Sequence, residues 1–291
     1  MLNLTTRLDI GHAGEDQLFA QASGDRALVA IADGAGGTGS GRQAATFLCD
    51  RVIHESGEIH DGAWWSTWLS EIDRQLESTH PGAETTAVVV QIAHGEVSGA
   101  SVGDSAAWLV SETGVVDLTA GQRAKPRLGS GHATPVAFGP IQMVGQLLVA
   151  TDGLFNYSGF NSISTCVREA DPAVAADQLV DGVRLRSGAL PDDLALVLCG
   201  NAAAGAADTA LIGTETVVHV RLLDEGTPVY RPAKAVIQSH YIVVLEPPLD
   251  YETEAELWEF PPGSVVRVGF RVLEDRVAPV AVAIADNGPT A

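Results

Sequence analysis

The sequence has only three cysteines, Cys49, Cys166 and Cys199. They form no CxxC pair and their number is odd, so the sequence predicts neither a disulfide framework nor a cysteine-based zinc site. Buried thiols in a reducing compartment are the simplest interpretation. We therefore expect a cytoplasmic protein.

Long hydrophobic runs are also missing. No apolar stretch reaches the roughly 18 residues that a membrane-spanning helix needs. Residues 1–9 lack the cationic start and apolar segment that are typical of a secretory signal. The sequence therefore favours a protein that neither enters a membrane nor carries an export signal.

Basic residues are scarce. The chain has 17 Lys and Arg against 37 Asp and Glu, which gives a formal net charge of −20. A field of this sign repels nucleic-acid backbones, so a nucleic-acid partner is not expected. It also repels phosphorylated substrates. An enzyme of this composition that acts on phosphate needs local positive charge, which bound divalent cations can supply.

Short apolar runs alternate with amphipathic segments over the first 200 residues. Strands are predicted at residues 28–33, 86–92, 97–101, 106–110, 147–152 and 194–199. Helices are predicted at residues 41–55, 63–78 and 173–185, the second with Asp61 as its N-terminal cap. This order indicates an α+β domain in which helices cover stacked antiparallel sheets.

The composition changes near residue 200. Residues 201–210 are small and weakly patterned, as in a linker. The segment after it shows no convincing helix, and strands are predicted at residues 217–223, 235–246, 254–260, 264–273 and 279–284. We expect a main domain over residues 1–200 and a small β-barrel-like domain over residues 211–291.

Carboxylates recur where the predicted strands begin or end. They are Asp33, Asp104, Asp152, Asp192 and Asp193, with Glu15 and Asp16 earlier in the chain. A single aspartate at such a place usually forms a turn. Several that converge repel one another unless they are protonated or bridged by cations. Carboxylate oxygens suit Mg²⁺ or Mn²⁺, so this repetition predicts a metal centre.

The order of these segments resembles the motif series of the protein phosphatase 2C family. The matching segments are GEDQ at residues 14–17, VAIADGAGG at 29–37, TTA at 85–87, SVGDSAA at 101–107, LT at 118–119, LVATDGL at 148–154 and DDLALV at 192–197. Each is short, but they occur in the family's order. The resemblance covers about residues 8–200 and does not reach residues 210–291.

The resemblance implies a four-layer α-β-β-α sandwich of two antiparallel sheets flanked by helices. It implies hydrolysis of phosphoserine or phosphothreonine on proteins by a water that bridges two Mn²⁺ or Mg²⁺ ions. The implied partner is a phosphoprotein substrate that a serine/threonine kinase phosphorylates and this chain dephosphorylates. The domain at residues 211–291 is then a possible docking module for that substrate.

The resemblance also implies site residues. In the family pattern, Asp33 is a ligand shared by the two metals, and Asp152 and Asp192 are further ligands of the first metal. These three residues are therefore the implied catalytic core. Glu15 serves the second metal mostly through water, and Asp16 orients that water. The full implied metal set is Glu15, Asp16, Asp33, Gly34, Asp104, Asp152 and Asp192.

The chain departs from the family pattern at four places. Ala35 stands where many members have a proton-donating His, and no Arg precedes the Glu-Asp pair. His12 is the candidate that replaces this Arg in binding phosphate. We expect the Arg7 side chain to be solvated rather than to reach the site. A third metal pairs Asp104 with an acidic residue that is Asn156 here, so that site is weakened. The Asp-His that follows Leu-Thr in the family is absent, which indicates a short flap.

The departures leave an alternative open, namely a catalytically silent phosphatase-like module that binds or regulates a signalling partner. Mutually repelling carboxylates favour the enzyme, because a silent copy has no use for them. The Gly-Ser-Gly at residues 129–131 lacks the Lys-Ser/Thr of a nucleotide-binding loop. We interpret it as part of the flap.

Overall fold

The computed structural model describes residues 1–35, 39–168, 171–201, 213–239, 242–246, 256–274 and 276–285. The chain divides into two compact units. The first unit comprises Met1–Ala202 with Val272–Val277, and the second comprises Ala203–Arg271 with Ala278–Ala291. Apart from residue 201, the predicted linker at residues 201–210 lies outside the described residues.

One sheet of the first unit is antiparallel and has five strands in the order β1-β12-β11-β8-β9. They are β1 (Leu2–Asp9), β12 (Leu194–Asn201), β11 (Gln146–Ala150), β8 (Ala106–Ser111) and β9 (Gly114–Asp117). The central strands β11 and β12 are apolar on both faces and almost completely buried. Such strands belong between two covering layers.

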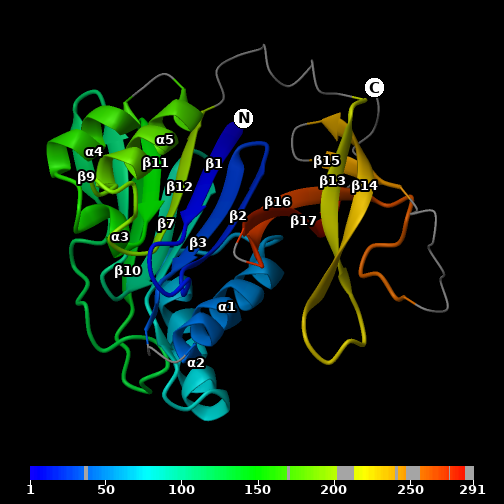
Figure 1. Cartoon of the computed structure of the whole chain (residues 1–291), viewed down its shortest axis with the longest axis horizontal. Helices are drawn as coiled ribbons and strands as arrows, with labels where there is room; N and C mark the ends of the chain where they lie inside the picture. Colours follow the sequence, from blue (N-terminus) through cyan, green and yellow to red (C-terminus); the bar gives the residue numbers. More distant parts are fainter. Residues whose placement is uncertain are drawn as a thin grey trace. The chain divides into compact units, whose positions relative to one another are not determined.

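Three helices cover one face of this sheet. They are α3 (Asp152–Phe155), α4 (Phe160–Val167) and α5 (Pro172–Val183). Their apolar faces join β8, β11 and β12 in one hydrophobic core. Figure 1 shows the helices beside β11 and β12. Helix α5 begins at Pro172, and the Asp171 side chain accepts hydrogen bonds from two backbone N–H groups of its first turn.

A second antiparallel sheet in the first unit has the strand order β10-β7-β6-β3-β2. These strands are β10 (Val136–Gln142), β7 (Glu96–Val102), β6 (Ala87–Ala93), β3 (Arg26–Ala32) and β2 (Gln17–Ser23). Two short strands, β4 (Gly34–Ala35) and β5 (Glu84–Thr85), pair with each other. In the chain, β4 follows β3 and β5 precedes β6. Strands β1 and β12 of the first sheet contact strands β2 and β3 of the second.

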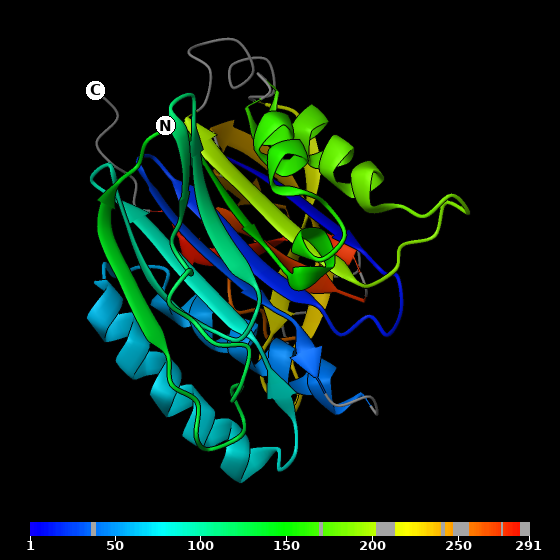
Figure 2. The same ribbon diagram turned by 90° about the vertical axis from the view of Figure 1, so that its left-hand side faces the viewer.

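Helices α1 (Ser40–Val52) and α2 (Gly62–Thr79) pack on the second sheet, with a 3₁₀ turn, η1 (Ile53–Glu55), between them (Figure 2). The Asp61 side chain accepts a hydrogen bond from Trp64 N, which confirms the predicted cap. Trp65 is fully buried on the core side of α2. All three predicted helices are present, while the short α3 and α4 were not predicted.

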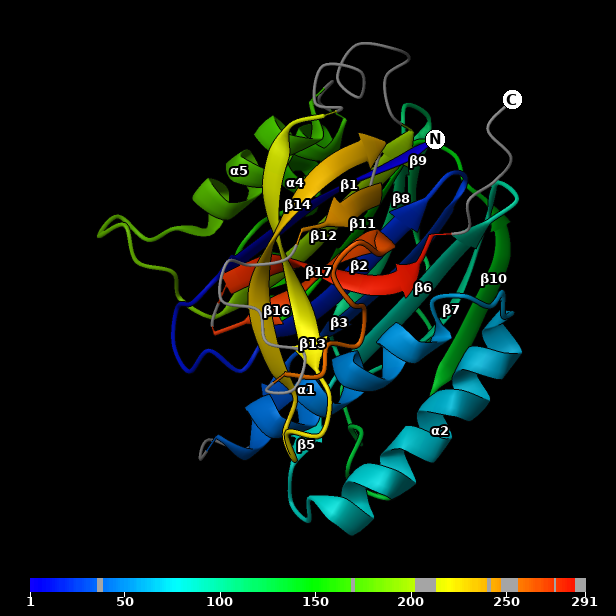
Figure 3. The same cartoon turned by 90° about the vertical axis from the view of Figure 1, so that its right-hand side faces the viewer.

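Strands β13–β17 belong mainly to the second unit (Figure 3). They are β13 (Glu215–Leu222), β14 (Val229–Ser239), β15 (Ile242–Leu245), β16 (Val265–Leu273) and β17 (Arg276–Ile284). They follow the order β16-β15-β14-β13-β17, and β16 also pairs with β17, so each strand has two neighbours within the set. Trp258 and Phe260 complete the apolar core of these strands.

Two strand predictions in this segment were wrong. Residues 235–246 form parts of two paired strands, β14 and β15, rather than one. Of the strand predicted at residues 254–260, the described part makes only an isolated bridge between Trp258 and Leu222. Trp258 and Phe260 pack in the core. Apolar residues close together in this segment give it the sequence pattern of a strand.

The described residues therefore form a mixed α/β fold with several sheets and few helices. Among them, no helix has the length and apolar character needed to cross a membrane. The three cysteines form no disulfide; Cys49 and Cys199 are buried and Cys166 is partly buried. Burial raises the pKa of the Cys199 thiol to about 12, as expected for an inert core thiol.

Candidate active site

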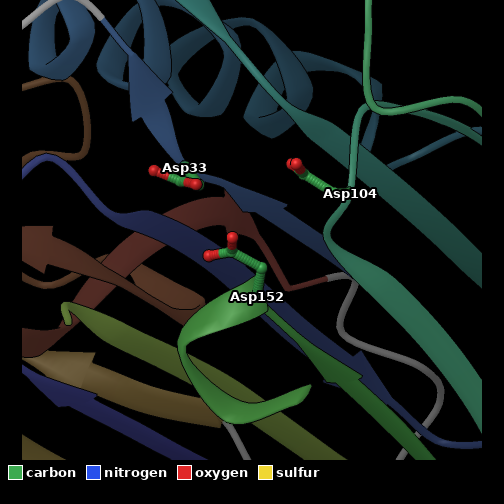
Figure 4. A group of neighbouring side chains, drawn as sticks. All are labelled: Asp33, Asp104 and Asp152. Atoms are coloured by element: carbon green, nitrogen blue, oxygen red, sulfur yellow. The ribbon is translucent and has the colours of Figure 1, made fainter. Parts of the chain in front are cut away.

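Three aspartates converge at one place in the first unit. One carboxylate oxygen from each of Asp33, Asp104 and Asp152 lies within 4.8 Å of the other two (Figure 4). Asp33 follows β3, Asp104 lies in the turn between β7 and β8, and Asp152 begins α3 after β11. The site therefore forms where strand ends from both sheets of the first unit meet.

Threonines of the predicted TTA segment hold Asp33 in place. The Thr86 hydroxyl accepts a hydrogen bond from Asp33 N at 2.9 Å, and Thr86 N donates to Asp33 O at 2.8 Å. Thr85 Oγ1 donates to the same carbonyl at 3.0 Å. Thr86 Oγ1 also bonds to Ser105 Oγ at 2.7 Å, next to Asp104. This network fixes two of the three site aspartates relative to each other.

The glycine after Asp33 is required by packing. A Cβ at Gly34 would lie 2.3 Å from the backbone of Gly41, at the start of α1. No side chain fits there, so the turn that carries Asp33 can approach α1 only with glycine at this position. Gly36 and Gly37 of the predicted motif lie outside the described residues.

The electrostatics of the cluster are unfavourable without cations. Burial and the neighbouring Asp152 raise the pKa of Asp33 to about 7. Burial, with the charges of Asp104 and Asp192, also raises the pKa of Asp152. Asp104 Oδ1 is buried and has no hydrogen-bond partner among the described residues. Carboxylates that repel in this way, with an unpaired oxygen, fit divalent cations that bind oxygen.

The predicted residues Glu15 and Asp16 are buried in the loop before β2. Thr151 Oγ1 donates to Asp16 Oδ2 at 2.8 Å and so connects this loop to the residue before Asp152. Burial and the charge of Asp33 raise the pKa of Asp16 well above its usual value. Both residues lie outside the group of three aspartates, so their predicted roles at a second metal stay predictions.

Asp192 also lies outside that group of three, although its charge raises the pKa of both Asp33 and Asp152. Its Oδ1 accepts a hydrogen bond from Asp193 N at 3.0 Å. Asp192 is therefore an electrostatic neighbour of the cluster in this structure. Its predicted place as a ligand stays a prediction.

Asp193 has a structural role that the sequence did not reveal. Its Oδ1 accepts hydrogen bonds from Gly11 N and His12 N, and its Oδ2 accepts one from Glu15 N, all at 2.8–3.0 Å. A buried carboxylate with three N–H donors is well satisfied. Asp193 thus holds residues 11–15 in place.

The side chain of His12 is exposed. The expected Arg before the Glu-Asp pair is absent from the sequence, but a guanidinium reaches that place from α1. Arg42 Nη2 lies 3.4 Å from Ala13 O, and a Cβ at Gly14 would lie 2.3 Å from the same nitrogen. Arg7 instead pairs with Asp177 at 2.6 Å. Arg42 is therefore a second candidate for contacting phosphate, one that only the fold reveals.

Arg127 brings positive charge to the aspartates themselves. Its Nη2 lies 3.5 Å from Asp104 Oδ2, and its charge lowers the pKa of Asp33 and Asp152. The next residue, Leu128, exchanges two backbone hydrogen bonds with Thr85 at 3.0 Å. Arg127 is thus held in place by backbone pairing beside the site.

The Gly-Ser-Gly segment after Arg127 binds an internal carboxylate. Asp73 of α2 is buried and accepts hydrogen bonds from the backbone N–H groups of Gly129, Gly131 and Ala133, at 2.7–3.1 Å. Asp73 therefore takes the place that an anion would occupy in a phosphate loop. It anchors residues 129–133 in the same way that Asp193 anchors residues 11–15.

Asn156 occupies the position where the family has an acidic residue. Its Nδ2 donates to Asp152 Oδ2 at 2.9 Å. This hydrogen bond lowers the pKa of Asp152, although burial and the neighbouring carboxylates raise it more. The amide therefore occupies one oxygen of the Asp152 carboxylate.

No family model matches the sequence, and no curated protein sequence matches it. Solved structures do match. The serine/threonine phosphatase PstP/Ppp of Mycobacterium tuberculosis is 21% identical with a TM-score of 0.56, covering 68% of this chain and 97% of that one. The serine/threonine phosphatase Stp1 of Staphylococcus aureus is 20% identical with a TM-score of 0.59, covering 70% and 96%.

The chain has the fold of the bacterial serine/threonine phosphatases. A structure of the PstP catalytic domain in complex with two manganese ions matches at 21% identity and a TM-score of 0.55. These phosphatases belong to the family that the sequence segments resemble, so the expected likeness is confirmed at the level of fold. The three site aspartates lie in segments that carry the resemblance, at Asp33, Asp104 and Asp152.

Proposed function

We propose that this chain is a metal-dependent protein phosphatase that hydrolyses phosphoserine or phosphothreonine. The observation that carries the proposal is the convergence of Asp33, Asp104 and Asp152 in the phosphatase fold, with raised pKa values that disfavour the metal-free, fully charged state. An acidic cluster of this kind is costly to hold unless cations bind it.

Mn²⁺ or Mg²⁺ would be held by Asp33, Asp152 and Asp192, with Glu15 on a second ion and the Gly34 carbonyl as a further ligand. When bound, such cations lower the pKa of a coordinated water, hold phosphate oxygens and neutralise charge on the leaving group. The charges of Asp152, Asp104 and Asp192 all raise the pKa of Asp33, so Asp33 lies near each of them. This supports its assignment as the residue shared between two ions.

The surrounding residues orient the substrate and the ligands. Asp16, which accepts the Thr151 hydroxyl, would orient water at the second ion. Arg127 and Arg42 supply guanidinium groups that can bind phosphate oxygens, in addition to the predicted His12. No side-chain acid stands at Ala35, so solvent water would protonate the leaving oxygen.

We propose that the two sheets and their helices form the predicted α-β-β-α sandwich. The packing of α3–α5 on one sheet and of α1 and α2 on the other supports this. We propose further that β13–β17 form a barrel-like domain, supported by their cyclic pairing, and that this domain docks phosphoprotein substrates. A cytoplasmic role opposite a serine/threonine kinase completes the proposal.

Calorimetric Mn²⁺ binding and turnover of an aryl phosphate, measured on the same preparations, test the assignment. We expect Asp152→Ala to lose high-affinity Mn²⁺ binding and activity together, while Asp25→Asn, an exposed carboxylate in the turn between β2 and β3, leaves both unchanged. Mn²⁺ binding without turnover in the wild type would favour the silent phosphatase-like module. Unchanged Mn²⁺-dependent turnover in Asp152→Ala contradicts the assigned ligands.

A further inference from the structure

A pocket adjoins the acidic cluster and shares Asp104 with it. It has a volume of about 320 Å³, and its lining includes Asp104, Trp108, Asp117, Gln122 and Phe155, with three alanines. Pockets for small ligands begin at about 300 Å³. This pocket therefore has the size for one long side chain.

Three of the lining residues carry buried polar atoms without hydrogen-bond partners. These atoms are Asp104 Oδ1, Trp108 Nε1 and Gln122 Oε1, and none has a partner among the described residues. Buried polar groups are nearly always paired, and leaving one unpaired costs roughly 1–3 kcal/mol. Of the three, Gln122 Oε1 is an acceptor outside the acidic cluster, so it calls for a ligand that donates a hydrogen bond.

The lining also determines the charge of that ligand. Two of the three unpartnered atoms are acceptors, and Asp117 adds a second carboxylate to that of Asp104. Trp108 and Phe155 have ring centroids 4.7 Å apart and supply aromatic surface. Carboxylates beside aromatic rings favour a cation that donates hydrogen bonds. An anionic or purely apolar ligand leaves these acceptors unpaired.

We propose that this pocket binds an arginine side chain of the phosphoprotein substrate, close to the phosphorylated residue. A guanidinium has five N–H donors in a plane and stacks on aromatic rings, and its stem packs against small apolar residues such as the alanines. The Asp117 carboxylate lies outside the acidic cluster and so can pair with the guanidinium. The role in substrate selection rests on the proposed phosphatase function.

A specific arginine site can be distinguished from general electrostatic attraction of basic peptides. A net charge of −20 attracts any basic peptide. A specific site instead responds to loss of one lining carboxylate. Asp117→Asn is suitable, because Asp117 Oδ1 accepts hydrogen bonds from Thr119 N and Thr119 Oγ1, and an amide oxygen keeps both. Glu112→Gln, exposed in the neighbouring β8–β9 turn and outside the lining, is the matched control.

Binding is tested without turnover by titrating arginine amide and norleucine amide into the full-length protein. The readout is the indole N–H resonance of Trp108, assigned by loss of the signal in Trp108→Phe. We expect a saturable shift with arginine amide only, about tenfold weaker in Asp117→Asn and unchanged in Glu112→Gln. The absence of a shift, or equal weakening in both variants, overturns the proposal.

Selection is tested with phosphothreonine peptides that carry a single Arg or Gln at each position within four residues of the phosphate. We expect the best Arg peptide to have about a tenfold lower KM than its Gln partner, and Asp117→Asn to remove most of that preference with little change in kcat. Aryl phosphate turnover should be the same in wild type and Asp117→Asn. Absent aryl phosphate turnover refutes the phosphatase, whereas turnover without Arg preference refutes the pocket alone.

Discussion

Replacing Asp33 with asparagine should stabilise the metal-free protein while it destroys the metal site. The backbone hydrogen bonds of Asp33 to Thr85 and Thr86 do not involve its carboxylate, so Asp33→Asn keeps them. What changes is the charge. The buried carboxylate and its repulsion by Asp152 disappear, and these are the main causes of the raised pKa.

The size of the effect follows from that pKa, which rises from 3.8 to about 7 on folding. A change of this size corresponds to about 4 kcal/mol between the charged and neutral forms. Solvent screening at this partly exposed site reduces it to about 2 kcal/mol. For a unit of this length, that is a rise of about 4–8 °C in the thermal midpoint.

The sign of the pH dependence is fixed by the same shift. Between pH 4 and 7 the folded protein binds more protons at Asp33 than the unfolded protein does, so wild-type stability falls as the pH rises through this range. The advantage of Asp33→Asn is therefore largest above pH 7 and declines as the pH falls toward 4. Below both pKa values the carboxyl is neutral in each state, and the advantage disappears.

Thermal unfolding in EDTA, at pH 8 and at pH 5, measures this. Mn²⁺ should raise the midpoint of the wild type at pH 8 and leave that of Asp33→Asn unchanged, because binding to the folded state alone stabilises it. Asp25→Asn serves as the control for loss of an exposed charge. If Asp33→Asn is no more stable than wild type in EDTA at pH 8, the repulsion argument is wrong.

Three further predictions concern residues around the cluster. Arg127→Gln should raise the pKa of Asp33 and Asp152, so the pH–rate profile at fixed Mn²⁺ should move to higher pH; an unmoved profile counts against this electrostatic role. Asp193→Ala removes the acceptor of three backbone N–H groups and should cost about 3 kcal/mol in urea unfolding; a loss below 1 kcal/mol contradicts the anchor. Asn156→Asp should strengthen a weak third Mn²⁺ site beside Asp104, seen as higher calorimetric stoichiometry or affinity; identical isotherms argue against that site.

Much of the first unit could be predicted because its signals are local. Apolar runs that end in aspartate mark β3 and β11, and helical periodicity with Asp61 as cap marks α2. The carboxylates at the ends of these strands also converge as the repeated pattern indicates. Strand β1 was not predicted, because it pairs with β12 from the far end of the unit.

The basic groups of the site could not be predicted, because they depend on tertiary contacts. Arg42 belongs to α1, yet its guanidinium lies beside Ala13, 29 residues earlier. Arg127 reaches Asp104 only because Leu128 pairs with Thr85 across the chain. In the sequence, Asp193 is only the neighbour of the predicted ligand Asp192. Its three N–H donors come from residues 11–15, which are about 180 residues away in the chain and contact it only in the folded protein.

Phosphate release from a phosphothreonine peptide, with and without Mn²⁺, tests the central claim most directly. The full-length protein should release phosphate only when Mn²⁺ or Mg²⁺ is present, with EDTA abolishing turnover and added Mn²⁺ restoring it. Asp33→Asn and Asp152→Ala should be inactive at every metal concentration while they remain folded. Turnover that persists in EDTA, or in either variant, contradicts the assignment of this acidic cluster as the catalytic metal centre.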